Sequence, residues 1–254
     1  MIGAIIGDVV GSRFEFNNTD NFNFNLFTKE CDYTDDTICT IAVADAALNG
    51  GDYGDLMHRW CRSYPKPMGG YGCSFAHWVA STNPKPYNSF GNGSAMRVAA
   101  IGWLYDSLDQ VEREAMLSAM PTHNHPEGIK GAVATASAIF LARTQGKEAM
   151  LEAMKSYYPQ WVEPRLGENS FDETCQGTMP VVFGIINKAT GFEEAIRYAI
   201  AVGGDSDTIA AIVGGIAEAI WGVPEQIYRE VVGYLPKDMI EVVEQFYRVL
   251  VVNR

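Results

Sequence analysis

The sequence predicts an all-α fold in a single domain over residues 1–254. Apolar residues recur with helical spacing along most of the chain, and helix start and stop signals lie at the ends of these patterns. No ladder of alternating strands is evident. With 47% hydrophobic residues the chain can bury a large core, and its length is close to the limit at which one core stops growing.

The first part of the chain contains eight helical patterns, each with an apolar face. They cover residues 3–12, 35–48, 54–63, 74–80, 94–106, 110–120, 126–144 and 147–157. Asn49-Gly50-Gly51 ends the second pattern. Asp109 and Glu112 have the spacing of a capping box, and Pro126 suits the first turn of a helix.

After a segment that contains proline and glycine, helical patterns resume. They cover residues 173–188, 192–202, 207–221, 224–232 and 238–251. Residues 181–186 are β-branched and apolar enough for a short strand, but a single strand would have no partner, so the all-α prediction is kept.

Long connections are expected between these helices, and loops of this length in a compact domain are usually functional or mobile. They cover residues 16–33, 64–73, 81–93 and 159–172.

The net charge of the chain limits the kinds of binding partner. The net charge is −12 and the isoelectric point is near 4.7, and this acidity opposes binding to a nucleic-acid backbone. A small phosphorylated ligand is still compatible, because one pyrophosphate needs only a local pocket of donors. Most of the acidity is explained by solubility.

Cysteine usage and hydropathy indicate the location. The five cysteines contain no C-x-x-C pair, which argues against a disulfide framework and a structural zinc site and fits a reducing cytoplasm. The apolar N-terminus has no basic segment before it and reads as a core helix rather than a signal peptide. No run reaches the ~18 apolar residues of a membrane span, so a soluble, cytoplasmic protein without a membrane partner is predicted.

Two acidic clusters stand directly before helices. Thr34-Asp35-Asp36 precedes the helix at 35–48, and Asp205-Ser206-Asp207-Thr208 follows Gly203-Gly204 and precedes the helix at 207–221. Each can be explained as a helix cap with acidic residues in the first turn. Two such clusters make repeated capping a weaker explanation.

The alternative is a metal site. Adjacent carboxylates repel each other unless a cation neutralises them, and carboxylate and hydroxyl oxygens without nearby His or Cys favour Mg²⁺, Mn²⁺ or Ca²⁺. Ala210, Gly214 and Ala217 lie on one side of the second helix and would let another helix approach closely. From spacing alone the cap and the metal site both stay open.

The loop between residues 89 and 97 combines glycine with the start of a helix. Gly91-Asn92-Gly93-Ser94 could bind an anion through free backbone N–H groups, or it could be a turn followed by a Ser94 cap. His123 and His125 precede another helix. An H-x-H pair can bind zinc, but no third soft ligand is near, so loop or core histidines are the simpler interpretation.

Five segments in this order resemble the ADP-ribosylglycohydrolase family, which includes the dinitrogenase reductase-activating glycohydrolases. The resemblance spans residues 3 to about 222. It is carried by Gly7-Asp8-Val9-Val10-Gly11-Ser12-Arg13-Phe14-Glu15, Thr34-Asp35-Asp36, Gly91-Asn92-Gly93-Ser94-Ala95-Met96-Arg97, Thr122-His123-Asn124-His125-Pro126 and Gly203-Gly204-Asp205-Ser206-Asp207-Thr208-Ile209-Ala210-Ala211.

The resemblance implies an orthogonal multi-helix bundle with a centre of two Mg²⁺ or Mn²⁺ ions. It implies that the metal ligands are Thr34, Asp35, Asp36, Asp205, Asp207 and Thr208. It places Glu15 at the mouth of the site. It implies that the substrate is bound by Gly91, Asn92, Gly93, Ser94 and Met96 around the pyrophosphate and distal ribose, by His123 and His125 beside the ADP part, and by Tyr71 in the Gly69-Gly70-Tyr71-Gly72 loop.

Two departures from the family pattern remove no expected ligand. Ser206 stands where the family more often has threonine, and Glu218 replaces a residue that is typically small. The segment between Glu15 and Thr34 is short, which affects the region that gates the site.

The activity implied by the resemblance is hydrolysis of the glycosidic bond between ADP-ribose and an acceptor. We expect Asp36, Asp35 or another carboxylate of the cluster to accept the proton of the attacking water, with Glu15 as a second candidate. The expected partner is an ADP-ribosylated protein, with arginine as the first acceptor, or a small ADP-ribose conjugate. Hydrolysis of O-acyl-ADP-ribose or another phosphorylated molecule, and non-catalytic ADP-ribose binding, are the alternatives.

Overall fold

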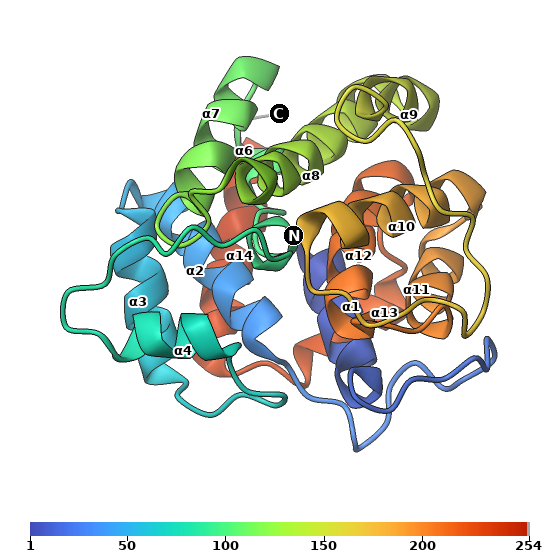
Figure 1. Ribbon diagram of the computed structural model, residues 1–254, viewed down its shortest axis with the longest axis horizontal. Coiled ribbons are helices and arrows are strands. Elements are labelled where there is room, and N and C mark those ends of the chain that lie inside the picture. Colours follow the sequence, from blue (N-terminus) through green and yellow to red (C-terminus); the bar gives the residue numbers. More distant parts are fainter. Residues whose placement is uncertain (253–254) are drawn as a thin grey trace.

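Helices and their connections make up the whole of the described structure. The structure is a computed structural model and describes residues 1–252. Within this range no strand is formed, and only two isolated β-bridges occur, Thr34 with Met68 and Gly91 with Thr174. The all-α prediction is therefore confirmed (Figure 1).

Each predicted helical pattern contains helix. The elements are α1 (Ile2–Gly11), η1 (Ser12–Phe14, a 3₁₀ turn), α2 (Asp35–Asn49), α3 (Tyr53–Ser63), α4 (Cys73–Ala80), α5 (Gly93–Met96), α6 (Ile101–Leu104), α7 (Leu108–Ala119), α8 (Pro126–Gln145), α9 (Lys147–Met154), α10 (Cys175–Lys188), α11 (Phe192–Ala201), α12 (Ser206–Trp221), α13 (Glu225–Val232) and α14 (Lys237–Val252). Gly50, with φ 68°, ends α2 as predicted.

Residues 181–186 are helical within α10, as the pattern at 173–188 predicted, and their apolar side chains are buried among neighbouring helices. Two other local predictions are wrong. The pattern at 94–106 is two short helices, because the chain turns after Arg97, whose side chain is buried under α7. Asp109 does not begin a capping box, since Ser107 is the N-cap of α7 and accepts a hydrogen bond from the backbone N–H of Gln110.

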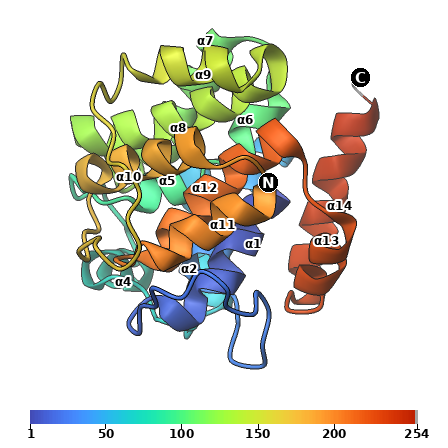
Figure 2. The same ribbon diagram turned by 90° about the vertical axis from the view of Figure 1, so that its right-hand side faces the viewer.

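The central contact of the fold is between α1 and α12, which lie side by side in both ribbon views (Figures 1 and 2). Their backbones touch: a side chain on Gly7 would collide with the carbonyl group of Ala210, and one on Gly3 with that of Gly214. The predicted close approach along the small face of α12 is therefore confirmed. Without it the two helix ends that carry Glu15 and Asp207 would be farther apart.

The remaining helices surround this pair. In Figure 1, α2, α3 and α4 lie on one side of it and α10 and α11 on the other, with α7, α8 and α9 across the top. Figure 2 shows α13 and α14 as an outer layer, where α14 packs on α2 and α13 on α1. Glu218 joins these layers, because it accepts hydrogen bonds from the backbone N–H of Gly3 and from the Tyr247 hydroxyl group.

The buried apolar side chains form one contiguous cluster that runs from α1 to α14. One domain over residues 1–254 stays a prediction, and residues 253 and 254 lie outside the described residues.

Within residues 1–252, no helix combines the length and the apolar character needed to cross a membrane.

Candidate active site in a carboxylate-lined cleft

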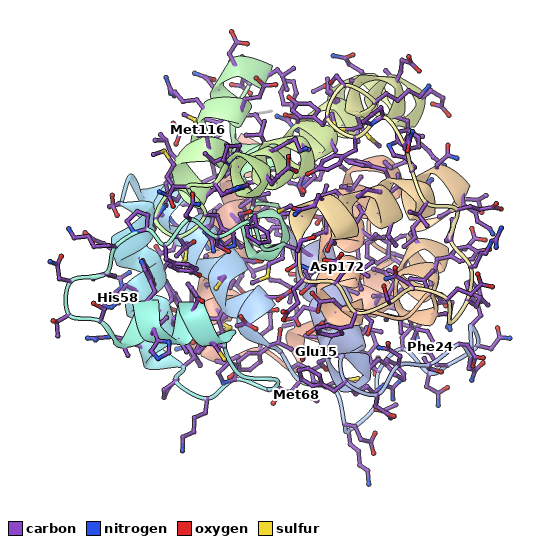
Figure 3. The ribbon with its side chains drawn as sticks, viewed as in Figure 1. Glu15, Phe24, His58, Met68, Met116 and Asp172 are labelled. Atoms are coloured by element: carbon purple, nitrogen blue, oxygen red, sulfur yellow. The ribbon has the colours of Figure 1, made fainter. Side chains whose placement is uncertain are left out.

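Three helix ends meet at the centre of the molecule. Glu15 follows α1 and η1, Asp36 lies in the first turn of α2, and Asp207 lies in the first turn of α12. Carboxylate oxygens of Glu15, Asp205 and Asp207 all lie within 4.8 Å of one another. The Thr208 hydroxyl group is 3.4 Å from Oδ1 of Asp36, so the two acidic clusters meet. Figure 3 shows Glu15 in the middle of the view, with Asp172 of the loop before α10 above it.

Asp8 holds the first cluster in place. Its carboxylate accepts hydrogen bonds from the backbone N–H groups of Thr34 and Thr37, each at 3.0 Å, and from both hydroxyl groups. Burial raises the pKa of Asp8, and these four donors oppose that effect. Thr34 in turn caps α2 by accepting from the N–H of Asp36, so its predicted capping role is confirmed.

The second cluster is held by the turn before α12. Gly203 and Gly204 have φ values of 86° and 85°, which favour glycine, and the Asn18 side chain binds both backbone groups of Gly204. Asp205 occupies the N-cap position but makes no capping hydrogen bond. Its Oδ2 instead accepts a hydrogen bond of 2.6 Å from the side-chain amide of Asn92. Capping therefore does not account for this carboxylate.

The electrostatics of the cluster favour a cation. Burial, followed by the charge of neighbouring carboxylates, raises the pKa values of Asp35, Asp36 and Asp207 well above their usual range. Burial and the charge of Asp205 raise the pKa of Glu15 to about 7. Burial also raises the pKa of Asp205 to about 6. In each case burial, followed for most of these groups by neighbouring negative charge, disfavours the ionised form, which a bound cation would stabilise.

One atom of the cluster has no partner. Oδ2 of Asp36 is buried and forms no hydrogen bond, although buried carboxylate oxygens are rarely left unpaired. Together with the oxygens of Asp205, Asp207 and Thr208, it provides a set of hard ligands of the kind that Mg²⁺ and Mn²⁺ prefer. The residues present therefore fit a divalent metal.

A cleft of about 710 Å³ opens above the carboxylates, a volume suited to a ligand of nucleotide size. Most predicted site residues line it. They are Glu15, Asp35, Asp36, Tyr71, Gly91, Asn92, Gly93, Met96, His123, Asp205, Asp207 and Thr208.

Three predicted site residues do not line the cleft. The Thr34 hydroxyl group donates to Asp8, and that of Ser94 donates to the carbonyl group of Gly128. Ser94 lies inside α5 and is not its cap. His125 caps α8, since its Nδ1 accepts a hydrogen bond from the N–H of Glu127.

Other residues of the site were not predicted from the sequence. Asp8 and Asn18 position the two acidic clusters, and Phe16, Arg97 and Glu173 line the cleft. Asp8 had one usable signal, because it is the only charged residue in the apolar segment 2–11. For Asn18 the sequence offers no signal, since its partner Gly204 is 186 positions away.

The family model described as ADP-ribosylglycohydrolase matches residues 1–253. The chain belongs to this family, and this membership identifies it as a hydrolase.

Two named relatives and one solved structure are similar to this chain. Human ADP-ribosylhydrolase ARH3 is 27% identical, over 94% of this chain and 90% of the human protein. ADP-ribosylarginine hydrolase Tri1 of Pseudomonas putida (strain GB-1) is 24% identical, over 88% of this chain and 70% of its own. A solved structure titled "ADP-ribosylglycohydrolase-related protein complex" has the same fold, with a TM-score of 0.75, 24% identity and coverage of 98% and 95% of the two chains.

Proposed function

We propose that this protein is a metal-dependent hydrolase that cleaves the glycosidic bond between ADP-ribose and an acceptor. The observation that carries the proposal is the meeting of two acidic clusters beneath a cleft, with a buried, unpaired oxygen on Asp36. The proposed cofactor is a pair of Mg²⁺ or Mn²⁺ ions held by the residues of the two clusters. Bound there, the ions would supply positive charge that orients the ribose hydroxyl groups and a water molecule.

The protein side chains have separate tasks in this proposal. Asp36, or Asp35 beside it, accepts the proton of the attacking water, and Glu15 is the second candidate because its pKa of about 7 suits proton transfer at neutral pH. Asn92 holds Asp205 in position through the 2.6 Å hydrogen bond. The Gly91–Gly93 turn, Met96 and His123 form the wall that would hold the ADP-ribose.

Arginine side chains of modified proteins are the proposed acceptors. A guanidinium group is a cation, and Glu15 and Glu173 at the cleft offer negative charge beside it. The relative from Pseudomonas putida is named for the arginine linkage. The net charge of −12 argues against a nucleic-acid substrate. A reducing cytoplasm is the proposed location, which agrees with the five free cysteines.

The proposal is tested with a panel of defined ADP-ribosylated substrates, each incubated with Mg²⁺ or Mn²⁺. We expect release of ADP-ribose, fastest from the arginine linkage. Release of AMP or inorganic phosphate would instead identify a hydrolase of phosphate esters.

Substitutions test the metal site separately. Asp36→Ala and Asp207→Ala should each reduce turnover by at least about a thousandfold, because the first removes the proposed base and the second a proposed metal ligand. The control is Asp106→Ala, at an exposed position away from the cleft, which should keep wild-type activity. Full activity in either cluster variant, or after exhaustive chelation, would contradict the mechanism.

A further inference from the structure

Arg97 is a buried cation without a carboxylate partner. It is 1% exposed, and its Nη2 donates to the carbonyl oxygen of Ser118 at 3.1 Å and to Oγ1 of Thr122 at 2.8 Å. Within residues 1–252 it forms no ion pair, and its Nε is buried without a hydrogen bond. Because a buried charge is costly, an unpaired guanidinium in the cleft wall needs an explanation other than stability.

The contact with Thr122 determines where protons lie. Oγ1 of Thr122 accepts from Arg97 and stands 2.7 Å from Nδ1 of His123. A hydroxyl group has one proton to donate, and Nδ1 is the only acceptor in contact with it among the described residues. If Nδ1 carried a proton, both neighbours would donate to Oγ1, and the threonine proton would be buried without an acceptor. The satisfied arrangement has Thr122 donating to Nδ1.

This arrangement leaves the ring proton of His123 on Nε2. The ring is buried, and burial together with the nearby charge of Arg97 holds the pKa of His123 well below 6.5, so the ring is neutral. Nε2 faces the Gly91–Gly93 turn, since a methyl group placed on Gly93 would be 3.4 Å from it and one on Gly91 would be 3.6 Å from it. A neutral N–H donor therefore lies beside the Gly91–Gly93 turn, on a ring that lines the cleft.

We propose that Arg97 and Thr122 are positioning residues that hold His123 as the neutral Nε2–H tautomer, so that the ring donates to a phosphate oxygen of ADP-ribose. The inference rests on the proposed function in one respect, the identity of the ligand. The tautomer follows from the contacts of Thr122 alone. It also gives the buried guanidinium a task, because Arg97 orders the hydroxyl group and adds positive charge near the phosphates.

The tautomer is measured first, in the metal-free and ligand-free wild-type protein. Nitrogen-15 NMR of the imidazole groups distinguishes a protonated from an unprotonated ring nitrogen, and the chain has only four histidines. Loss of one set of signals in His123→Ala assigns the resonance. We expect a proton on Nε2 of His123; a proton on Nδ1 would overturn the inference, whether or not the protein is an enzyme.

The role of the tautomer is tested with a matched pair of variants. Thr122→Val removes the hydroxyl group at nearly constant volume, and Thr122→Ser keeps it. We expect Thr122→Val to populate the other tautomer and to weaken ADP-ribose binding in the presence of Mg²⁺ by about tenfold, measured by titration calorimetry. Thr122→Ser should keep the wild-type tautomer and bind within about twofold of the wild type. Equal binding by both variants would overturn the inference.

A double-mutant cycle separates the relay from general damage to the fold. In a His123→Ala background, Thr122→Val should weaken ADP-ribose binding no further, because the group that it orients is absent. An additional loss of the same size would mean that Thr122 acts only on the fold, and would overturn the relay. If the wild-type protein with Mg²⁺ does not bind ADP-ribose, the proposed function fails, and with it the assigned ligand. The NMR result then decides the tautomer independently.

Discussion

At the scale of single residues, Asp8 shows how a position outside the predicted ligands can control the site. It does not line the cleft, yet it receives four hydrogen bonds from Thr34 and Thr37 at the start of α2. These bonds determine where α2 begins and therefore where Asp35 and Asp36 lie. Asn92 does the same for Asp205 from the opposite side of the cleft.

Asp8→Asn tests this arrangement. The amide group of asparagine would direct an N–H group at one of the donors of Thr34 and Thr37, so a buried hydrogen bond would be lost and a repulsive contact would replace it. We expect the free energy of unfolding to fall by about 2–3 kcal/mol, with a large loss of activity. Urea denaturation measures the first effect.

The control for this prediction is Asp106→Asn at an exposed position, which should change stability by less than about 0.5 kcal/mol. A stable Asp8→Asn variant that also keeps wild-type activity would show that the hydrogen bonds to Asp8 do not position α2.

At the scale of elements, the contact between α1 and α12 sets the geometry of the site. Gly3 and Gly7 of α1 face Gly214 and Ala210 of α12, and the two backbones touch there. Glu15 follows the end of α1, and Asp207 lies at the start of α12. Both carboxylates therefore reach the same point because the two helices are close along their length.

Gly7→Ala should be destabilising although alanine is the better helix former. The methyl group would collide with the carbonyl group of Ala210, and both helices would have to separate. We expect a loss of about 2–4 kcal/mol in the free energy of unfolding, against a gain of about 1 kcal/mol from helix propensity.

Gly191→Ala is the matched control, because Gly191 has an ordinary extended φ and open space around its Cα. Thermal unfolding monitored by circular dichroism should show a smaller loss for this variant than for Gly7→Ala, since alanine at this N-cap position of α11 costs at most about 1 kcal/mol. Equal melting temperatures for the two alanine variants would contradict the packing argument.

At the scale of the whole molecule, the carboxylates of the cleft make the stability of the metal-free protein depend on pH. The pKa of Glu15 rises from 4.5 to about 7, and that of Asp205 from 3.8 to about 6. Below about pH 3 both groups are protonated in the folded and unfolded chains. As the pH rises, the unfolded chain ionises first, so stability is lost until the pH passes the folded pKa values.

We therefore expect the melting temperature of the chelated wild-type protein to fall relative to that of Glu15→Gln between about pH 4.5 and 7. Comparing the two proteins cancels the opposite contribution of His123, whose lowered pKa adds stability as the pH rises. Saturating Mg²⁺ should remove or reverse the difference, because it neutralises the ionised cluster. If the difference in melting temperature does not change with pH or with metal, the ionisation of Glu15 is not the cause of the pH dependence.

Much of the fold can be predicted from the sequence because the free energies that start and stop helices are local. Periodicity located the helices, Thr34 capped α2 and Gly50 ended it. The acidic clusters were recognisable for a similar reason, since their carboxylate and hydroxyl groups are adjacent in the chain. The errors lie where tertiary contacts overrode a local pattern, such as the break after Arg97, whose side chain bonds to the carbonyl oxygen of Ser118 in α7.

The meeting of the two clusters depends on contacts between distant residues and could not be read from spacing. Asn92 and Asp205 are 113 positions apart, and Thr208 and Asp36 are 172 apart. The protonation of the His123 ring likewise depends on tertiary contacts, namely the hydrogen bond from the buried Arg97 to Thr122 and the direction in which the Thr122 hydroxyl group donates. A sequence pattern shows which chemical groups a chain carries. The pKa values and tautomers of these groups depend on burial and on hydrogen-bond direction, and both are fixed only when the helices pack.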